Sequence, residues 1–151
     1  MGFGAIHQFH SGTATGDAIT NQMLHLQRRL RGLGHVSEIY AEHIGDGLAE
    51  FVRPVSELVD RPATLLLVHH SMGHTAFDAI EATTLPIVTV FHSITPAHFF
   101  DDPVIRHFVR VGFRQLRALA ARSLFGVADS NHNRKQMYDA GFRSVRVLPV
   151  R

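Results

Sequence analysis

The stretch HSGTATGDAIT, residues 10–20, joins a short apolar run to a segment of helical periodicity. Gly12 and Gly16 would let the backbone approach a ligand closely, and a loop that enters a helix presents N–H groups which favour an anion. The spacing is not G-x-G-x-x-G, and the lysine of a P-loop is missing. The loop therefore suits a phosphate without specifying which one. An equally open interpretation is a flexible turn before a helix that Thr15 or Asp17 caps.

His92 ends a segment of strong strand character, LPIVTVFHS, and Ser93, Thr95 and Pro96 follow it closely. A histidine in this place can present a ring nitrogen to a ligand hydroxyl near neutral pH. A structural histidine bonded to a loop carbonyl is the alternative, and the spacing does not separate the two.

The chain has 12 histidines, and His69, His70 and His74 invite a metal interpretation. Successive strand residues point to opposite faces, so His69 and His70 cannot both bind one ion without a bend. No H-E-x-x-H spacing and no nearby acidic ligand accompany them, so we expect no metal site. His25 and His107 are expected to be surface or helix-packing residues.

Strands and helices alternate along the whole sequence. Apolar periodicity and start and stop signals predict strands at 3–9, 35–41, 63–70, 85–93, 124–130 and 145–150, and helices at 17–33, 54–60, 73–82, 101–123 and 131–141. This order is typical of the α/β class, here a Rossmann-like three-layer domain with a parallel sheet of about six strands. Ligands of such sheets bind beyond the carboxyl ends of the strands, which groups residues 10–17, 69–74, 92–98 and 129–134 at one edge.

The two long helices have distinct faces. The apolar positions of the first are Ile19, Met23, Leu26, Leu30 and Leu33, with Gly34 as its C-terminal cap, and the buried side of the longest is marked by Ile105, Phe108, Val109, Leu116, Leu119 and Ala120. Another side of the longest helix carries a stripe of Arg106, Arg110, Arg114 and Arg117. A solvated face is the favoured interpretation of this stripe, ahead of a weakly bound lipid or phosphate surface.

The composition bounds the class of protein. Hydrophobic residues make up 45% and charged residues 19%, which indicates a globular chain, and cysteine is absent, which excludes disulfides and thiolate metal sites. The first residues, MGFGAIHQ, lack a basic signal region, and no apolar run is long enough for a membrane span, so we expect a cytoplasmic protein. Residues 101–151 hold ten basic and four acidic residues, a net +6. We expect no nucleic-acid partner, because a solvated helix face accounts for this charge.

Five pieces in order resemble a known family: HQF…TATGDAIT, LRGLGHVSEIY, LLLVHHS, PIVTVFHSITP and ADSNHNRKQMYDAGF…VRVLPV. They resemble the N-terminal domain of GT-B glycosyltransferases of the subfamily-four type, over nearly the whole chain. The resemblance implies a Rossmann-like, acceptor-side half of a retaining two-domain enzyme that uses a nucleotide-sugar as co-substrate and no other cofactor.

The resemblance also implies roles for individual residues. The glycine loop would contact the donor diphosphate through Gly16 and, less directly, Gly12, and His92 would contact the transferred sugar or stabilise charge. Asp17 and Asn21 would meet the acceptor. The further residues expected to face the cleft are His70, Ser93, Ser130, Asn131 and Arg134.

The donor-binding C-terminal domain of that family has no counterpart in residues 1–151. We therefore expect a piece of a longer chain, rather than a natural half, that is inactive alone and self-associates through its uncovered cleft face. Two other classes stay open. One is a non-catalytic module that binds a sugar, a nucleotide or a protein. The other is a small complete enzyme using His70, His92, Asp129 and Asn131, although these form no recognised catalytic arrangement.

Overall fold

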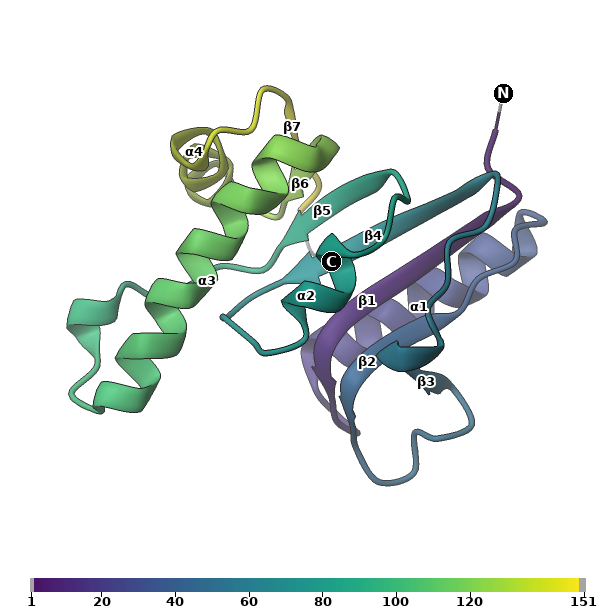
Figure 1. Cartoon of the computed structure of the whole chain (residues 1–151), viewed down its shortest axis with the longest axis horizontal. Helices are drawn as coiled ribbons and strands as arrows, with labels where there is room; N and C mark the ends of the chain where they lie inside the picture. The colour runs from purple at the N-terminus through teal and green to yellow at the C-terminus, as the bar shows by residue number, and fades with distance from the viewer. Residues whose placement is uncertain (1, 150–151) are drawn as a thin grey trace. The chain divides into compact units, whose positions relative to one another are not determined.

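The fold was analysed in a computed structural model that describes residues 2–149 (Figure 1). The α/β class is confirmed: seven strands form a parallel sheet in the order β3-β2-β1-β4-β5-β6-β7, consistent with a Rossmann-like three-layer domain. The strands are β1 (Ala5–Thr13), β2 (Ile39–Ile44), β3 (Val52–Pro54), β4 (Thr64–His70), β5 (Ile87–Phe91), β6 (Ser123–Ala128) and β7 (Val145–Val147). The helices are α1 (Ala18–Gly32), α2 (Phe77–Glu81), α3 (Pro103–Arg122) and α4 (Asn131–Ala140), with 3₁₀ turns at Val55–Glu57 and Ala97–Phe99.

The sheet holds one strand more than expected. The helix predicted at 54–60 is only the 3₁₀ turn Val55–Glu57, and the preceding residues form β3, which pairs with β2 at Ile39, Tyr40 and Ala41. A three-residue strand is too short to show alternation, so only its pairing with β2 defines it. The predicted end of the last strand, residue 150, lies outside the described residues.

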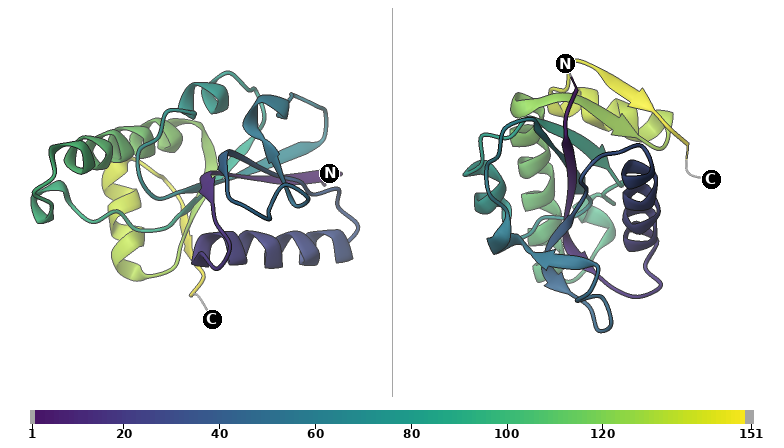
Figure 2. Two further views of the ribbon diagram at one scale, coloured as in Figure 1. Left: turned by 90° about the horizontal axis from the view of Figure 1, so that it is seen from below. Right: turned by 90° about the vertical axis from the view of Figure 1, so that its right-hand side faces the viewer.

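The chain divides into two compact units, residues 2–68 with 78–86 and residues 69–77 with 87–149. In the first unit α1 runs alongside β1 (Figures 1 and 2), and Met23 on its inner face is fully buried in a core with Ile39, Ala41, Leu48 and Val52. Leu33 does not join this core and is 75% exposed, because α1 ends at Gly32. The C-cap is Leu33, and Gly34, which was expected to be the cap, follows it with φ of 96°.

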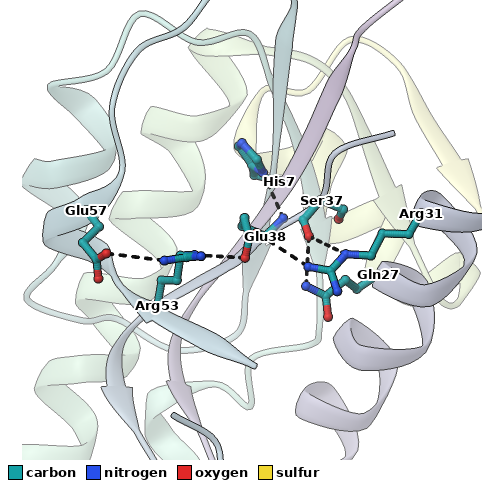
Figure 3. Close-up of polar contacts among 7 residues, drawn as sticks. All are labelled: His7, Gln27, Arg31, Ser37, Glu38, Arg53 and Glu57. Atoms are coloured by element: carbon teal, nitrogen blue, oxygen red, sulfur yellow. Dashed lines mark hydrogen bonds and ion pairs between the residues drawn. The ribbon is translucent and has the colours of Figure 1, made fainter. Parts of the chain in front are cut away.

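Polar bonds join the elements of the first unit beside this core (Figure 3). Gln27 Nε2 and Arg31 Nε of α1 donate to the Ser37 carbonyl oxygen at 3.0 and 3.1 Å. The carboxylate of Glu38 accepts from Arg53 Nε of β3 at 3.0 Å and lies 3.6 Å from Arg31 Nη2. Helix α1, β2 and β3 are thus linked through two adjacent residues, Ser37 and Glu38.

In the second unit, α3 and α4 pack on each other and on β6. The core-facing positions Val109, Leu116 and Leu119 of α3 are buried as predicted, and Phe108 and Ala120 are half-buried. Ile105 is exposed instead, because the first turn of α3 extends beyond the strands and lies by the turn Ala97–Phe99 (Figure 1). Of the arginine stripe, Arg106 is half-buried and the other three residues are exposed.

Two further expectations concern the surface. His25 and His107 are both exposed, as predicted. Within residues 2–149, no helix combines the length and apolar character needed to cross a membrane.

Stability should depend on pH through His7. Its Nδ1 accepts the Glu38 N–H at 3.0 Å, and burial lowers its pKa from 6.5, an effect that the nearby Glu38 carboxylate only partly offsets. Below a pH of 6.5 the unfolded chain therefore binds more protons than the folded one, and the free energy of unfolding falls as the pH drops further. We predict a shallower fall for His7→Asn, whose amide oxygen accepts the same bond without titrating.

Urea unfolding at a series of pH values between about 7.5 and 5.5 measures this dependence. The exposed His25→Asn variant is the control and should keep the native slope. Equal slopes for His7→Asn and the native chain would contradict the prediction.

Candidate functional site

In the second unit, the segments at the ends of β4 and β5, which were predicted to share one edge, are in contact. His69 Nδ1 lies 2.8 Å from His92 Nε2, and the two rings stack with centroids 5.1 Å apart and planes 24° apart. Phe91, the last residue of β5, pairs with Ala128, the last residue of β6. The residues directly after these strands, His92 and Asp129, therefore start from the same edge. Gly16 belongs to the first unit, so its proximity to His92 stays a prediction.

The backbone of His92 is held on both sides. Its N–H donates to the His70 carbonyl oxygen at 2.8 Å. Ser93 then adopts φ of 44°, a left-handed conformation that non-glycine residues rarely take and that costs about 1–3 kcal/mol. Ile94 is buried, with 3% of its surface exposed. Backbone strain of this kind persists where surrounding contacts fix it, and it is frequent at binding and catalytic sites.

The loop after β4 is fastened to α3. The side chain of His70 is 1% exposed, and its Nε2 donates to the Gly112 carbonyl oxygen at 2.8 Å. Gly73 N–H donates to the Phe108 carbonyl oxygen at 3.0 Å, and Gln115 Nε2 donates to the His74 carbonyl oxygen at 2.8 Å. His70 is predicted to face the cleft; its Nε2 bonds the backbone of α3, and its ring centroid lies 6.1 Å from that of His74.

His69 and His70 have different partners, His92 and Gly112. Among residues 2–149, no group of three His, Cys, Asp or Glu side chains could hold a metal ion.

The loop after β6 starts α4 with a side-chain cap. Ser130 Oγ accepts the Asn133 N–H at 3.1 Å, and the Asp129 carboxylate accepts from Asn133 Nδ2. Asn131 and Arg134 are exposed on the first turn of α4. Ser130 therefore caps the helix, Asp129 bonds the side chain of Asn133, and Asn131 and Arg134 are exposed to solvent.

The opening loop is shorter than predicted, and Gly12 is not part of it. Strand β1 continues to Thr13, with Gly12 paired to His43 and Thr13 to Ile44 of β2. Pairing with β2 decides this, because Gly12 disfavours a strand and Thr13 alone of these last residues favours one. A backbone N–H within a strand is less available to a phosphate than one in a free loop, so only residues 14–17 retain the predicted loop character.

Asp17 is the N-cap of α1. Its Oδ2 accepts the Thr20 N–H at 2.9 Å and the Thr20 hydroxyl at 3.1 Å. The carboxylate thus occupies the place where the helix dipole would favour a ligand anion. The N–H groups of Ala14 and Asp17 already donate to Thr20 Oγ1 and to the Ala14 carbonyl oxygen. A diphosphate here would have to bind through other backbone N–H groups, such as that of Gly16, with the carboxylate opposing it. Asn21, also predicted to meet the acceptor, is exposed on the first turn of α1.

His10 is a neighbour of this loop that the sequence did not single out. It is 8% exposed, and its Nδ1 donates to the Gly12 carbonyl oxygen at 2.6 Å. Burial lowers its pKa, so the ring is neutral at physiological pH. A neutral imidazole adds no positive charge for a phosphate.

Comparison of the chain with protein-family models and with curated proteins gives no match.

A side chain at Gly16 would strain the backbone without causing a steric clash. Its φ is 83°, and a Cβ added there would meet no atom of residues 2–149 within 4 Å. We predict that Gly16→Ala lowers the free energy of unfolding by about 1 kcal/mol and that Gly16→Asn, which tolerates this conformation, lowers it less. Urea denaturation checks both, with Gly12→Ala as the control because its Cβ would lie 3.9 Å from the His43 Cβ, an ordinary contact. Equal losses at Gly12 and Gly16 would contradict the prediction.

A side chain at Gly73 would disturb the attachment of the loop after β4 to α3. A Cβ at this position would approach the Phe108 carbonyl oxygen too closely and lie 2.7 Å from the Gly112 nitrogen. Because both atoms are backbone, we predict that Gly73→Ala destabilises the fold by about 1–3 kcal/mol. The matched control is Gly32→Ala at the end of α1, which meets no atom of the described chain within 4 Å and should be neutral or stabilising. Thermal or urea unfolding that finds the two variants equally stable would refute the close crossing.

Proposed function

We propose that this chain is the N-terminal, acceptor-side half of a retaining glycosyltransferase of the GT-B fold, subfamily-four type. It would act with a donor-binding half to move a sugar from a nucleotide-sugar to an acceptor. The observation that carries the proposal is His92, held at the carboxyl end of a parallel strand by a bond to His69 and followed by a strained residue. The Rossmann-like sheet and the order of the five resembling sequence pieces support it.

In this proposal His92 acts by contacting the transferred sugar. An imidazole offers one donor and one acceptor nitrogen, which suits a hydroxyl that can itself donate and accept. Its ring can also stabilise positive charge that develops on the sugar carbon, or negative charge on the leaving group, according to its protonation. Asn131 and Arg134 would add an amide and a cation at the same strand edge, since α4 begins just after β6, whose last residue Ala128 pairs with Phe91.

The opening loop would contribute less than the resemblance alone suggests. Gly16 keeps the backbone freedom that a close diphosphate contact needs. The Asp17 carboxylate caps the same helix, so the loop offers an anion a few N–H groups and no net positive charge. Most of the stabilisation of the departing diphosphate would therefore come from the donor-binding half, and the chain alone should not turn over a nucleotide-sugar.

The test compares glycosyl transfer and donor hydrolysis by the chain alone and by a protein that contains both halves. We expect activity only with both halves. His92→Ala should then lower kcat/KM by roughly 30- to 1,000-fold, the cost of about 2–4 kcal/mol of transition-state stabilisation. His25→Ala, on the exposed face of α1, is the control and should leave the rate unchanged.

Three outcomes would reject all or part of the proposal. Rapid turnover by residues 1–151 alone would show a complete enzyme rather than a half. An unchanged rate for His92→Ala in the two-half protein would remove His92 from the site. Binding of a sugar or nucleotide with no transfer by either form would favour the non-catalytic module.

A further inference from the structure

The contact between His69 and His92 has a consequence for how His92 meets any ligand. A neutral imidazole carries a hydrogen on one nitrogen and a lone pair on the other. At 2.8 Å, Nδ1 of His69 and Nε2 of His92 are within hydrogen-bond distance, so one of the two must donate and the other accept. The tautomer of either ring then dictates that of its partner.

We propose that His69 is a positioning residue that holds the imidazole of His92 in one orientation and one tautomer. The existence of this pair does not depend on the proposed glycosyl transfer, but its effect on catalysis rests on that function. The tautomer decides whether Nδ1 of His92 donates or accepts. His69 would therefore set the polarity of the group that His92 presents to a sugar hydroxyl or a phosphate oxygen.

The surroundings of His69 suit this task. The residue is 3% exposed, so its ring is confined by packing rather than free to rotate in solvent. The next residue, His70, is fixed twice: its side chain bonds the Gly112 carbonyl oxygen, and its own carbonyl oxygen accepts the His92 N–H. The strand ends that carry the two rings are therefore joined by a backbone hydrogen bond from His92 to His70, the residue after His69.

His92 is constrained in turn by the two residues after it. Ser93 takes a left-handed conformation that is costly for a serine, and the buried Ile94 comes next. A strained backbone together with a ring–ring hydrogen bond is the pattern expected where the direction of a side chain matters for binding.

Two isosteric variants isolate the hydrogen bond. His69→Asn keeps a polar atom near the place of Nδ1 that can donate or accept, and His69→Leu has nearly the same shape but neither capacity. Both leave a similar space where the ring was, so the difference between them reports the bond and not the packing. The controls are His25→Asn and His25→Leu at an exposed position.

The first measurement is nuclear magnetic resonance of the ring nitrogens in the 151-residue chain labelled with ¹⁵N, at a pH where both rings are neutral. We expect scalar coupling across the hydrogen bond between His69 Nδ1 and His92 Nε2, and ring shifts of His92 that correspond to one tautomer. His69→Asn, which can still bond Nε2, should keep His92 shifts closer to one tautomer than His69→Leu, which should give the averaged shifts of an exchanging imidazole. Absence of the coupling in the folded native chain, or one unchanged tautomer in His69→Leu, would overturn the proposal.

The second measurement uses the two-half protein. His69→Leu should lower kcat by about 10- to 100-fold with a smaller change in KM, as is usual when the partner that orients a functional side chain is lost, and His69→Asn should recover most of the rate. Equal rates for Asn and Leu would show that the bond does not serve catalysis. If the native two-half protein transfers no sugar, the proposed function fails, while the nitrogen shifts still decide whether His69 orients His92. If His69→Leu does not fold, the coupling in the native chain still provides the test.

Discussion

The loop after β4 crosses α3 with Gly73 against Gly112, so closely that neither position has room for a side chain. A Cβ on Gly112 would lie 2.8 Å from the Gly73 nitrogen, and one on Gly73 would lie 2.7 Å from the Gly112 nitrogen. This crossing lets the His70 ring reach the Gly112 carbonyl oxygen and lets His74 exchange bonds with Gln115. The end of β4, which carries His69, is thereby fixed to the longest helix. The His69 ring that bonds His92 therefore has a fixed support.

Several polar residues at the strand ends have hydrogen-bond partners within the fold. Each could bind a ligand only through donors or acceptors that these partners do not already occupy. Asp17 and Ser130 cap α1 and α4, and Asp129 accepts from Asn133. Caps of this kind are each worth about 1 kcal/mol, enough to explain the residue types without a ligand. His92 differs because its ring contacts a second histidine instead of closing a helix or a turn. This is why it carries more of the functional argument than the other residues at the same strand ends.

The sequence was informative where a local pattern fixes the outcome. Apolar runs located β4 and β5, and the helix predicted at 101–123 lies close to α3, which runs from Pro103 to Arg122 with Asp102 as its N-cap. It failed where pairing between distant segments decides: β3 has three residues, and β1 extends through Gly12 only because β2 continues beside it. The bond between His69 and His92 was missed for the same reason. Residues 23 positions apart meet through strand register, which no local periodicity encodes, and the only hint was a histidine near the end of each of two successive strands.

Buried polar atoms of the first unit help to fix the alignment of β1 with its neighbours. Nδ1 of His7 meets the Glu38 N–H, and the side chain of the next residue, Gln8, reaches the Met23 carbonyl oxygen at 2.9 Å. An apolar core alone would tolerate a β1 displaced by two residues, since such a shift returns side chains to the same faces. With these two bonds, a displaced strand would leave a buried imidazole and a buried amide without partners, at a cost of about 1–3 kcal/mol each. Misaligned forms of this sheet are therefore penalised by polarity where packing alone would accept them.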